Sequence, residues 1–599
     1  MSPALSANEQ VVCTLDGAAA SPCKTSDGSG EIRYENLSTG SHQLLVEIRG
    51  ADGAVTSRSR TLELTTARVI VFGATPGGIT AAIAAARAGQ TVAILEPTRW
   101  VGGMMSGGLS KTDIGWRGAE VIGGLASEFF DKVRAAETAR GACPGSCTFD
   151  FEPQVAERVF EDMLRAAQVI VERSASLASV QKDAARISTL TTSRGTVEGE
   201  VFIDASYEGD LMAMAGVPFR VGREARVLAD PADDPAQLAM QEDDAGVLQY
   251  RVPRGGVVDP YRVPGDPTSG TLPYIEPRPS FIRGAGTPDS RVMAYTYRLC
   301  VTDDPSNRIP FERPENYDPA QFEASGRLSD QWVAQTGVDL AVTMFNPERV
   351  ALSKDHAYSK YDLNGGSTFS IDMTAPDLNQ SYVEADEATR ERIREAYRAY
   401  IRGLLYFWQT DPRLRGLNQK IARFGFCKDE FVDRGGWPHQ LYVREARRMV
   451  GEYVMNENDV LQNGRRPPIS DPIGFGAYNI DVHTVRYFAA PVNWPDGTRR
   501  EAIVNEGFLT LRQPNDAPYP VSYRALTPRA ADATNLLDPV TLSATHIAYS
   551  ALRMEPTYMI LGQAAGTAAA LAVETHQTVQ SINYSTLRER LQAAGQHLP

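Results

Sequence analysis

The sequence predicts an α/β fold, and three observations lead to this prediction. Residues 69–96, "VIVFGATPGGITAAIAAARAGQTVAILE", read as a short apolar strand, a glycine turn, an alanine-rich helix and a second strand that ends in an acid. Residues 201–209, "VFIDASYEG", form another apolar strand that ends in acid and glycine. Residues 555–574 form a long helix of small residues. This alternation is typical of a Rossmann-like domain.

The flanking composition divides the chain into four segments. Residues 1–66 contain only short alternating strands separated by Gly, Asp and Ser turns, which predicts a small all-β module. We expect residues 67–225 to form the first part of the nucleotide-binding domain and residues 521–599 its C-terminal part with a tail helix. Residues 226–520 are rich in Pro, Tyr, Arg and Asp and show few regular periods. They predict an inserted α+β substrate or cap domain.

Composition excludes several classes of protein. The chain has 599 residues, 42% of them hydrophobic, and a formal net charge of −14. That charge argues against a nucleic-acid partner, which requires a basic surface. The apolar run around residues 564–573 is too short to span a membrane. The first ten residues, "MSPALSANEQ", lack the basic and apolar regions of a signal peptide.

The spacing of the six cysteines bears on the redox state of the cellular compartment. Cys13 and Cys23 flank a turn-rich spacer, and Cys143 and Cys147 bracket "PGS". Two close pairs predict two disulfides and therefore an oxidising compartment, so we expect a secreted or periplasmic protein whose leader is absent from this sequence. Four unrelated thiols in a cytoplasmic protein are the alternative. The remaining two cysteines are expected to stand alone, and no CxxC pair suggests a metal site.

The first glycine turn has the pattern of a dinucleotide site. Gly73, Thr75 and Gly78 occupy the G-x-G-x-x-G positions, with Gly77 beside the third. The first glycine permits a tight turn, the third permits close packing of helix on strand, and the helix N-terminus favours the pyrophosphate. Thr75 replaces the second glycine and offers a hydroxyl donor. Glu96 ends the next strand, where a carboxylate can accept hydrogen bonds from both ribose hydroxyls and disfavours NADP.

A second glycine cluster, "VGGMMSGGL" at residues 101–109, follows Glu96. FAD is long and remains bound, so close backbone is needed along its phosphates, ribityl chain and ring. NAD-binding folds usually continue directly into the next helix. The second cluster therefore favours FAD over NAD as the cofactor, although NAD as the sole dinucleotide remains an alternative.

Several segments together resemble a known family. They are "GATPGGITAAIAAARAG", "LEPTRWVGGMMSGGLSKTD", "FIDASYEGDLMAMAGV", "AYTYRLCVTDDPSNRIPF", "LYVREARRMVGEYV", "YNIDVHTVR" and "HIAYSALRMEPTYMILGQAAGTAAA". From about residue 68 to about residue 590 the chain resembles the bacterial FAD-dependent oxidoreductase family of the glutathione-reductase/fumarate-reductase structural class. The resemblance implies a discontinuous FAD domain of the glutathione reductase type with an inserted substrate domain. It implies no particular substrate.

The resemblance also implies roles for individual residues. The pyrophosphate would be lined by Gly73, Thr75, Gly77 and Gly78, and the adenosine ribose held by Glu96. The flavin side would be lined by Gly102, Gly103, Met104, Met105 and Ser106. The strand ending in Asp204 would pass near the FAD phosphates. The isoalloxazine would meet Gly562, Gln563, Ala564, Ala565 and Gly566. A covalent flavin link stays open.

The N-terminal stretch "CTLDGAAASPC…GSHQLLVEIRGADG" resembles the Cys-bridged Ig-like repeats of bacterial secreted proteins. A whole sandwich carries about seven strands, whereas four or five can be found here, so the module is expected to be partial. Surface attachment and a passive spacer are its two interpretations, and the spacer is preferred.

A flavin supplies the redox step, so the protein must bind substrate and manage one proton. His483 follows Asp481 by two residues, which on a strand places both on one face. His546 precedes Arg553 by two helical turns. Either histidine is a candidate base and Arg553 a candidate oxyanion holder, whereas a hydrogen-bonded core histidine is the alternative for each. Segment 441–454 predicts a salt-bridged helix carrying Arg444, Arg447 and Arg448, with an anion clamp near the substrate as the alternative.

These features predict an enzyme, an FAD-dependent oxidase or dehydrogenase that takes hydride from a small polar or sugar-like substrate. Its partners would be that small molecule and an electron acceptor, of which oxygen is one candidate, with no nucleic acid and no membrane span. Two alternatives stay open: fumarate-reductase-like reduction of a C=C bond, and a non-catalytic surface-binding protein.

Overall fold

The structure is a computed structural model. It describes residues 10–15, 18–20, 40–49, 55–64, 67–115, 117–142, 149–224, 250–252, 256–279, 288–336, 344–350, 359–365 and 369–599. The predicted disulfide pairs, Cys13 with Cys23 and Cys143 with Cys147, lie outside the described side chains.

A five-stranded parallel sheet organises the nucleotide-binding part. Its strand order is β26-β11-β5-β6-β7, formed by Leu536–Leu537, Val201–Asp204, Val69–Phe72, Val92–Glu96 and Ile170–Arg173. All five strands pair in parallel, through four neighbouring pairs. The predicted α/β fold with a parallel sheet is therefore confirmed. Because β26 comes from the C-terminal end of the chain, the two ends of the sequence share one sheet; the exact domain boundaries stay a prediction.

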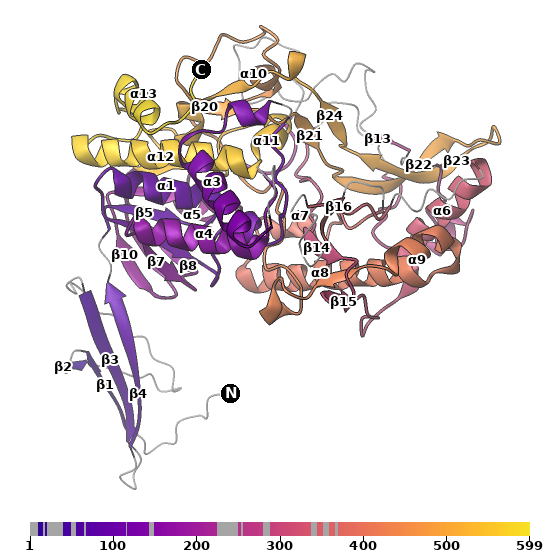
Figure 1. The fold of residues 1–599 in the computed structure, drawn as a ribbon, viewed down its shortest axis with the longest axis horizontal. Coiled ribbons are helices and arrows are strands. Elements are labelled where there is room, and N and C mark those ends of the chain that lie inside the picture. The colour runs from indigo at the N-terminus through magenta and orange to yellow at the C-terminus, as the bar shows by residue number, and fades with distance from the viewer. Residues whose placement is uncertain are drawn as a thin grey trace.

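Two helices that are far apart in the sequence cover this sheet (Figure 1). Helix α1 (Pro76–Arg87) follows the first glycine turn, and α12 (Glu555–Thr575) lies directly along it. A Cβ on Gly562 would overlap the carbonyl of Gly77, and a Cβ on Gly566 would overlap the carbonyl of Ala81. Small residues thus allow the two backbones to approach closely. Helices α3 (Gly124–Ala139), α4 (Pro153–Ala166) and α13 (Tyr584–Ala593) pack around this pair.

The chain between β11 and β26, which we call the inserted part, contains another sheet and a long helix. The sheet is antiparallel, in the order β15-β18-β14-β17-β16. These strands are Arg308–Pro310, Gly425–Cys427, Leu299–Thr302, Lys360–Leu363 and Glu348–Arg349. Helices α6 (Glu323–Thr336), α8 (Glu387–Thr410) and α9 (Arg415–Ile421) lie beside it. Strand β22 (Arg486–Asn493) pairs with β23 (Arg499–Glu506), and β21 (Ile480–Val482) with β24 (Leu509–Leu511).

Two sequence predictions fail in the inserted part. Cys300 and Cys427, expected to stand alone, form a disulfide that joins β14 to β18 across 127 residues of sequence. Pairing of neighbouring strands brings them together, which no local pattern could indicate. Segment 441–454 is extended rather than helical, with β19 at Arg448–Met449 pairing with β12 (Phe219–Arg220). Its arginines point to different partners because successive side chains of extended backbone alternate in direction.

The N-terminal module is a four-stranded antiparallel sheet in the order β2-β1-β3-β4. Its strands are Ala18–Ala20, Gln10–Leu15, Gly40–Arg49 and Val55–Leu64. The long β3–β4 hairpin extends away from the rest of the molecule (Figure 1). This agrees with an all-β module; a second sheet, which a sandwich requires, is not present among the described residues. Within the part of the chain that the structure describes, no helix is long and apolar enough to cross a membrane.

Candidate flavin and substrate site

A cavity of about 280 Å³ opens at the carboxyl ends of β5 and β6. This is the edge at which open parallel sheets bind ligands. Residues from segments singled out in the sequence line its wall, among them Gly73, Thr75, Glu96, Gly103 and Ser206. Helix α8 contributes charged side chains to the other wall, including Arg390 and Arg394.

The first glycine turn is held tightly against β11. Gly73 has φ +98°, and a Cβ there would lie 2.9 Å from the backbone of Ala205. A Cβ on Gly78 would overlap the carbonyl of Gly73. Thr75 caps α1: its Oγ1 accepts from the N–H of Gly78 at 3.1 Å and donates to the carbonyl of Ala205 at 2.8 Å. The Thr75 hydroxyl proton is therefore engaged by the protein, not free as the sequence suggested.

The carboxylate of Glu96 reaches back to the same turn. Its Oε2 accepts from the N–H of Ala74 at 2.7 Å, and its Oε1 accepts from the N–H and hydroxyl of Thr98 at 2.8 and 2.7 Å. Burial raises the pKa of Glu96, although these hydrogen bonds oppose the shift. Oε2 accepts only one of these hydrogen bonds and has a second lone pair, so Glu96 can still accept from a ribose hydroxyl in the cavity that it lines.

The second glycine cluster separates into residues that face the cavity and residues that face the core. Gly103 has φ +48° and lies so close to the Tyr207 hydroxyl that a Cβ would overlap it. Gly102, with φ +98°, precedes the short helix α2 (Gly103–Ser106). Met105 is fully buried, and Ser106 donates from Oγ to the carbonyl of Val101 at 2.5 Å. Only the start of this cluster therefore lies beside the cavity.

Asp204 supports the cavity from behind. It is fully buried and accepts hydrogen bonds from the N–H and hydroxyl of Ser206 and from the N–H of Met212. Burial raises its pKa to about 6. Its place at the end of β11 was expected, but the cavity wall itself is formed by Ser206 and Tyr207.

The C-terminal set lies inside a helix contact rather than at a cavity. Gly562 and Gly566 face α1, as the fold requires, and Ala564 and Ala565 are fully buried. Gln563 accepts at Oε1 from the N–H of Leu125 at 2.6 Å. The residues of α12 that border two smaller cavities are Glu555, Pro556, Thr557 and Ile560, with Met554 before them.

His483 lies between two carboxylates. Its Nδ1 is 2.8 Å from Oδ2 of Asp372, and its Nε2 is 3.4 Å from Oδ2 of Asp481. Asp372 also forms an ion pair with Arg444 at 2.7 Å. Burial would raise the pKa of Asp372, but Arg444 and His483 hold it below its ordinary value. Burial would also raise the pKa of Asp481, but His483 and Arg553 hold it well below its ordinary value.

Arg553 connects this group to a smaller cavity. Its Nη1 donates to the Tyr442 hydroxyl at 2.6 Å, and its Nη2 donates to the carbonyl of Asp481 at 3.0 Å. Tyr442 lines a small cavity together with Met104, Leu109, Thr112, Asp113, Arg298, Met554 and Glu555. We call Asp372, Asp481, His483, Arg444, Arg553 and Tyr442 the His483 cluster. The sequence found Asp481 but not Asp372, which lies 111 residues from His483 and gives no local signal.

His546 belongs to a different group. It begins α11 (His546–Leu552), and its Nδ1 is 2.8 Å from both carboxylate oxygens of Glu445. Glu445 also pairs with Arg448 at 2.9 Å. Neither His546 nor His483 belongs to the walls of the cavities named above, so cavity contact does not separate the two histidines. The contacts of His546 agree with the alternative of a hydrogen-bonded core residue, and a catalytic role for either histidine stays a prediction.

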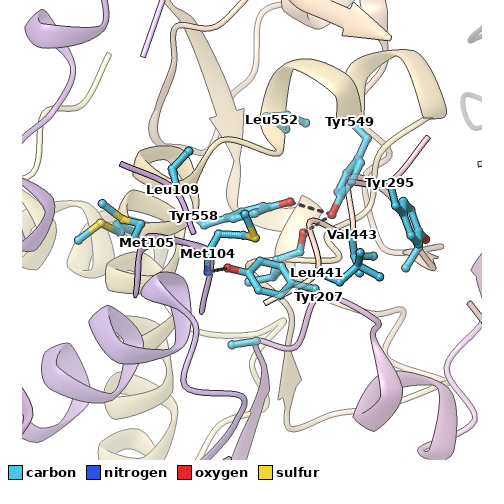
Figure 2. Close-up of a cluster of buried hydrophobic side chains, with 14 of the residues drawn as sticks. Met104, Met105, Leu109, Tyr207, Tyr295, Leu441, Val443, Tyr549, Leu552 and Tyr558 are labelled. Carbon is cyan, nitrogen blue, oxygen red and sulfur yellow. Dashed lines mark hydrogen bonds between the residues drawn. The ribbon is translucent and has the colours of Figure 1, made fainter. Parts of the chain in front are cut away.

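Tyr207, Tyr549 and Tyr558 line the interior between the two glycine clusters and α11 (Figure 2). The Tyr207 hydroxyl accepts from the N–H of Met104 at 2.9 Å, and the hydroxyls of Tyr549 and Tyr558 are 2.8 Å apart. The Tyr207 hydroxyl also donates to Glu555 at 2.7 Å. Neither Tyr207 nor Glu555 was among the predicted site residues. Their proximity joins positions 348 residues apart in the sequence.

The residues around the first cavity fit the adenosine and phosphate part of a dinucleotide. They provide a glycine turn without room for side chains, a helix N-terminus and a carboxylate at the end of the second strand. The fold and this site define a dinucleotide-binding α/β protein. The family model for FAD dependent oxidoreductases matches residues 68–591. The chain belongs to this family; it is an FAD-dependent oxidoreductase and FAD is its cofactor.

Solved structures resemble parts of the chain. They include the OxyS anhydrotetracycline hydroxylase from Streptomyces rimosus, at 16% identity, TM-score 0.21, covering 27% of this chain and 36% of that one. L-proline dehydrogenase from P. horikoshii is 14% identical with a TM-score of 0.21, and the match covers 26% of this chain and 59% of that one. L-amino acid deaminase from Proteus vulgaris is 16% identical with a TM-score of 0.20, and the match covers 27% of this chain and 55% of that one. The matched regions thus span about a third to three fifths of those chains. No curated protein matches this chain.

Membership of an enzyme family decides between the earlier alternatives. A non-catalytic surface-binding protein and NAD as the sole dinucleotide are both wrong. The Ig-like character of the N-terminal module stays a prediction.

Proposed function

We propose that this FAD-dependent oxidoreductase removes hydride from a small polar or sugar-like substrate, as an oxidase or dehydrogenase, with the His483 cluster as its substrate site. The observation that supports this proposal is that His483 lies between Asp372 and Asp481. Arg553 donates to the hydroxyl of Tyr442, which lines a small cavity together with Met104. Met104 belongs to the second glycine cluster, which the sequence assigns to the flavin side.

FAD, when bound, supplies the acceptor for a hydride, which carries the two electrons of the reaction. The protein must then accept the proton that leaves the substrate hydroxyl or amine. We assign this role to Nε2 of His483, because Asp372 fixes the imidazole through Nδ1 and the contact of Nε2 with Asp481 is long. Arg553, with an unpartnered buried Nε, would hold the substrate oxygen as its negative charge develops.

The FAD-binding residues form part of the same proposal. Gly73, Thr75, Gly77 and Gly78 would surround the pyrophosphate, Glu96 the ribose, and Gly102 and Gly103 the ribityl chain. On the flavin side we place Met104 and the first residues of α12, in place of the segment from Gly562 to Gly566, because that segment packs on α1. Asp204, Met105 and Ser106 would support this wall from the core.

Charge pairing favours oxidation of a polar donor over reduction of an unsaturated acid. Arg298 is paired with Asp362 at 2.8 Å, Arg444 with Asp372, and Arg553 lies 3.6 Å from Asp481. A dicarboxylate substrate would need free cations, whereas carboxylates suit the hydroxyl and amine donors of a polar substrate.

The test is anaerobic mixing of purified holoenzyme with panels of alcohols, amines and sugars while the visible flavin absorbance is recorded. Bleaching by a polar donor, followed by recovery of the absorbance on addition of oxygen or another acceptor, is the expected result. Absence of bleaching by every donor, together with rapid reoxidation of chemically reduced enzyme by unsaturated acids, would replace the proposal with C=C reduction.

We also propose an oxidising compartment, secreted or periplasmic, for this chain. The buried disulfide between Cys300 and Cys427 supports it, because glutathione and thioredoxin keep most cytosolic thiols reduced. Counting free thiols in protein isolated under denaturing, alkylating conditions from the native host tests this; labelling of both cysteines would contradict it.

A further inference from the structure

Glu555 occupies an unusual position for a carboxyl group. It is the first residue of α12 and only 5% exposed. Its Oε1 accepts a hydrogen bond from the Tyr207 hydroxyl at 2.7 Å, and the Tyr207 oxygen in turn accepts from the N–H of Met104 at 2.9 Å. Because the Tyr207 proton is committed to Glu555, the direction of this chain of hydrogen bonds is fixed.

The second carboxyl oxygen, Oε2, is buried and has no hydrogen-bond partner among the described residues. Glu555 borders the small cavity whose wall also contains Thr112, Asp113, Arg298 and Tyr442. No ion pair joins Glu555 to a described cation, and Arg298 is engaged by Asp362. Burial raises the pKa of Glu555 to about 8, even though the Tyr207 hydrogen bond favours the ionised form.

A buried carboxyl group without a cation keeps its proton. Since Oε1 is already an acceptor, the proton is assigned to Oε2, on a residue that borders the cavity. An O–H group left without an acceptor in a dry site is destabilising. The N-terminus of a helix favours an anion, so the position of Glu555 in α12 does not explain the neutral form. The acceptor must come from a bound molecule.

We propose that Glu555 is a neutral acid that donates a hydrogen bond from Oε2 to an acceptor atom of the bound flavin ring, with Tyr207 as its positioning residue. The ring carries carbonyl oxygens and unprotonated nitrogens, and either type of atom suits this donor. The inference rests on the proposed placement of the flavin side at Met104 and the start of α12.

Other groups face the same place and must be separated from Glu555. Tyr207 and Tyr558 have their pKa raised well above the ordinary value by burial, so they stay neutral. Tyr442, Asp113 and Arg298 share the cavity wall. Burial also raises the pKa of Asp113. An Asp113→Asn variant therefore has to accompany the Glu555 variants.

The experiment follows the visible spectrum of bound FAD in the holoenzyme through the neutral and alkaline range. The wild-type spectrum is expected to change with a midpoint near pH 8. Glu555→Gln keeps a hydrogen-bond donor, so it should retain FAD and lose the midpoint. Glu555→Leu removes the donor and should weaken FAD binding about tenfold in fluorescence titration. Asp113→Asn should keep the midpoint.

Glu457 offers a matched control. It begins α10 (Glu457–Leu461), its Oε2 is also buried without a partner, and burial raises its pKa to about 7, but it lines none of the described cavities. Glu457→Gln should leave the flavin spectrum and its pH dependence unchanged. A midpoint that survives Glu555→Gln, or wild-type FAD affinity in Glu555→Leu, would overturn the inference.

Failure of the FAD site itself would look different. Gly103→Ala places a Cβ on the Tyr207 hydroxyl and is expected to lose FAD while circular dichroism shows a folded chain. If Gly103→Ala loses FAD but the Glu555 variants behave like wild type, only the role of Glu555 is wrong. If folded Gly103→Ala retains FAD at wild-type affinity, the proposed site is wrong.

Discussion

At the scale of single residues, the two candidate histidines differ in what surrounds them. His483 contacts one carboxylate on each ring nitrogen and is 12% exposed in its side chain, and Tyr442 of the same cluster lines a small cavity. His546 is 3% exposed in its side chain and is held by Glu445. A base must reach solvent or substrate to release its proton, so the structure favours His483 for that role.

The pair provides a direct comparison. His483→Gln should slow reduction of the flavin by an identified donor by about 10²–10⁴-fold, the usual contribution of a general base, while the visible FAD spectrum stays unchanged. His546→Gln should instead lower the melting temperature and leave the rate of flavin reduction within a few fold. Stopped-flow absorbance and thermal melts measure the two effects. Equal loss of rate in both variants would contradict the assignment.

At the scale of elements, the crossing of α1 and α12 depends on missing side chains. Gly562 is helical, so an alanine there costs nothing in backbone conformation, but its Cβ would overlap the carbonyl of Gly77. Because α1 begins at the dinucleotide turn, a displaced α12 would disturb both that turn and the start of α12 at Glu555.

We therefore expect Gly562→Ala to reduce the free energy of unfolding by about 2 kcal/mol or more, as overpacking does, and to weaken FAD binding. Gly89→Ala is the control: it has φ +85° and no atom within 4 Å of its Cβ, so it should cost only the backbone strain of about 1–2 kcal/mol with FAD affinity unchanged. Denaturant unfolding and fluorescence titration provide the readouts. Unfolding at wild-type denaturant concentrations for Gly562→Ala would refute the close crossing.

Strands β14 and β18 are connected by a disulfide as well as by backbone hydrogen bonds. The Cys300–Cys427 disulfide closes a loop of 127 residues. Loss of such a cross-link in the Cys300→Ala, Cys427→Ala double variant should cost about 2–5 kcal/mol by releasing the unfolded chain. Unfolding of the wild type in the presence of a reductant should converge on the same midpoint. Identical curves with and without reductant would show that the bond does not contribute.

At the scale of the whole molecule, a buried charge cluster joins the nucleotide-binding part to the inserted part. The ammonium of Lys360 lies 3.2 Å from Glu152, 2.8 Å from Asp429 and 3.0 Å from Glu430. Glu152 caps α4 of the first part, whereas Lys360 belongs to β17 of the second. Burial raises the pKa of Glu430 to about 7.

Removal of this central cation should be costly and dependent on pH. Lys360→Met leaves buried carboxylates uncompensated, which costs about 3–5 kcal/mol. A raised carboxyl pKa stabilises the fold at low pH, and that stabilisation is lost as pH rises through about 7. The loss in melting temperature should therefore be larger at pH 8 than at pH 5. Lys111→Met, which removes an exposed pair with Glu348, should cost at most about 1 kcal/mol at either pH. Equal losses for Lys360→Met at both pH values would exclude this mechanism.

The sequence predicted those features of the site that follow from local pattern. Gly73, Gly78 and Glu96 are found by spacing, since each acts within one βαβ unit. The segment from Gly562 to Gly566 was assigned by the family resemblance, and its two glycines lie against α1. Small residues at a helix contact give the same sequence signal as small residues at a ligand. The helix predicted around Arg444 failed because tertiary contacts override local periodicity.

By itself, the sequence determined the α/β class, the dinucleotide turn and the family, because these depend on residues close together along the chain. Tertiary structure alone decided which carboxylate holds His483, which tyrosine holds Glu555 and which cysteines pair. Those partners lie 111, 348 and 127 residues apart. Contacts at such separations depend on how the two parts of the chain pack together, and side-chain periodicity contains no information about that packing.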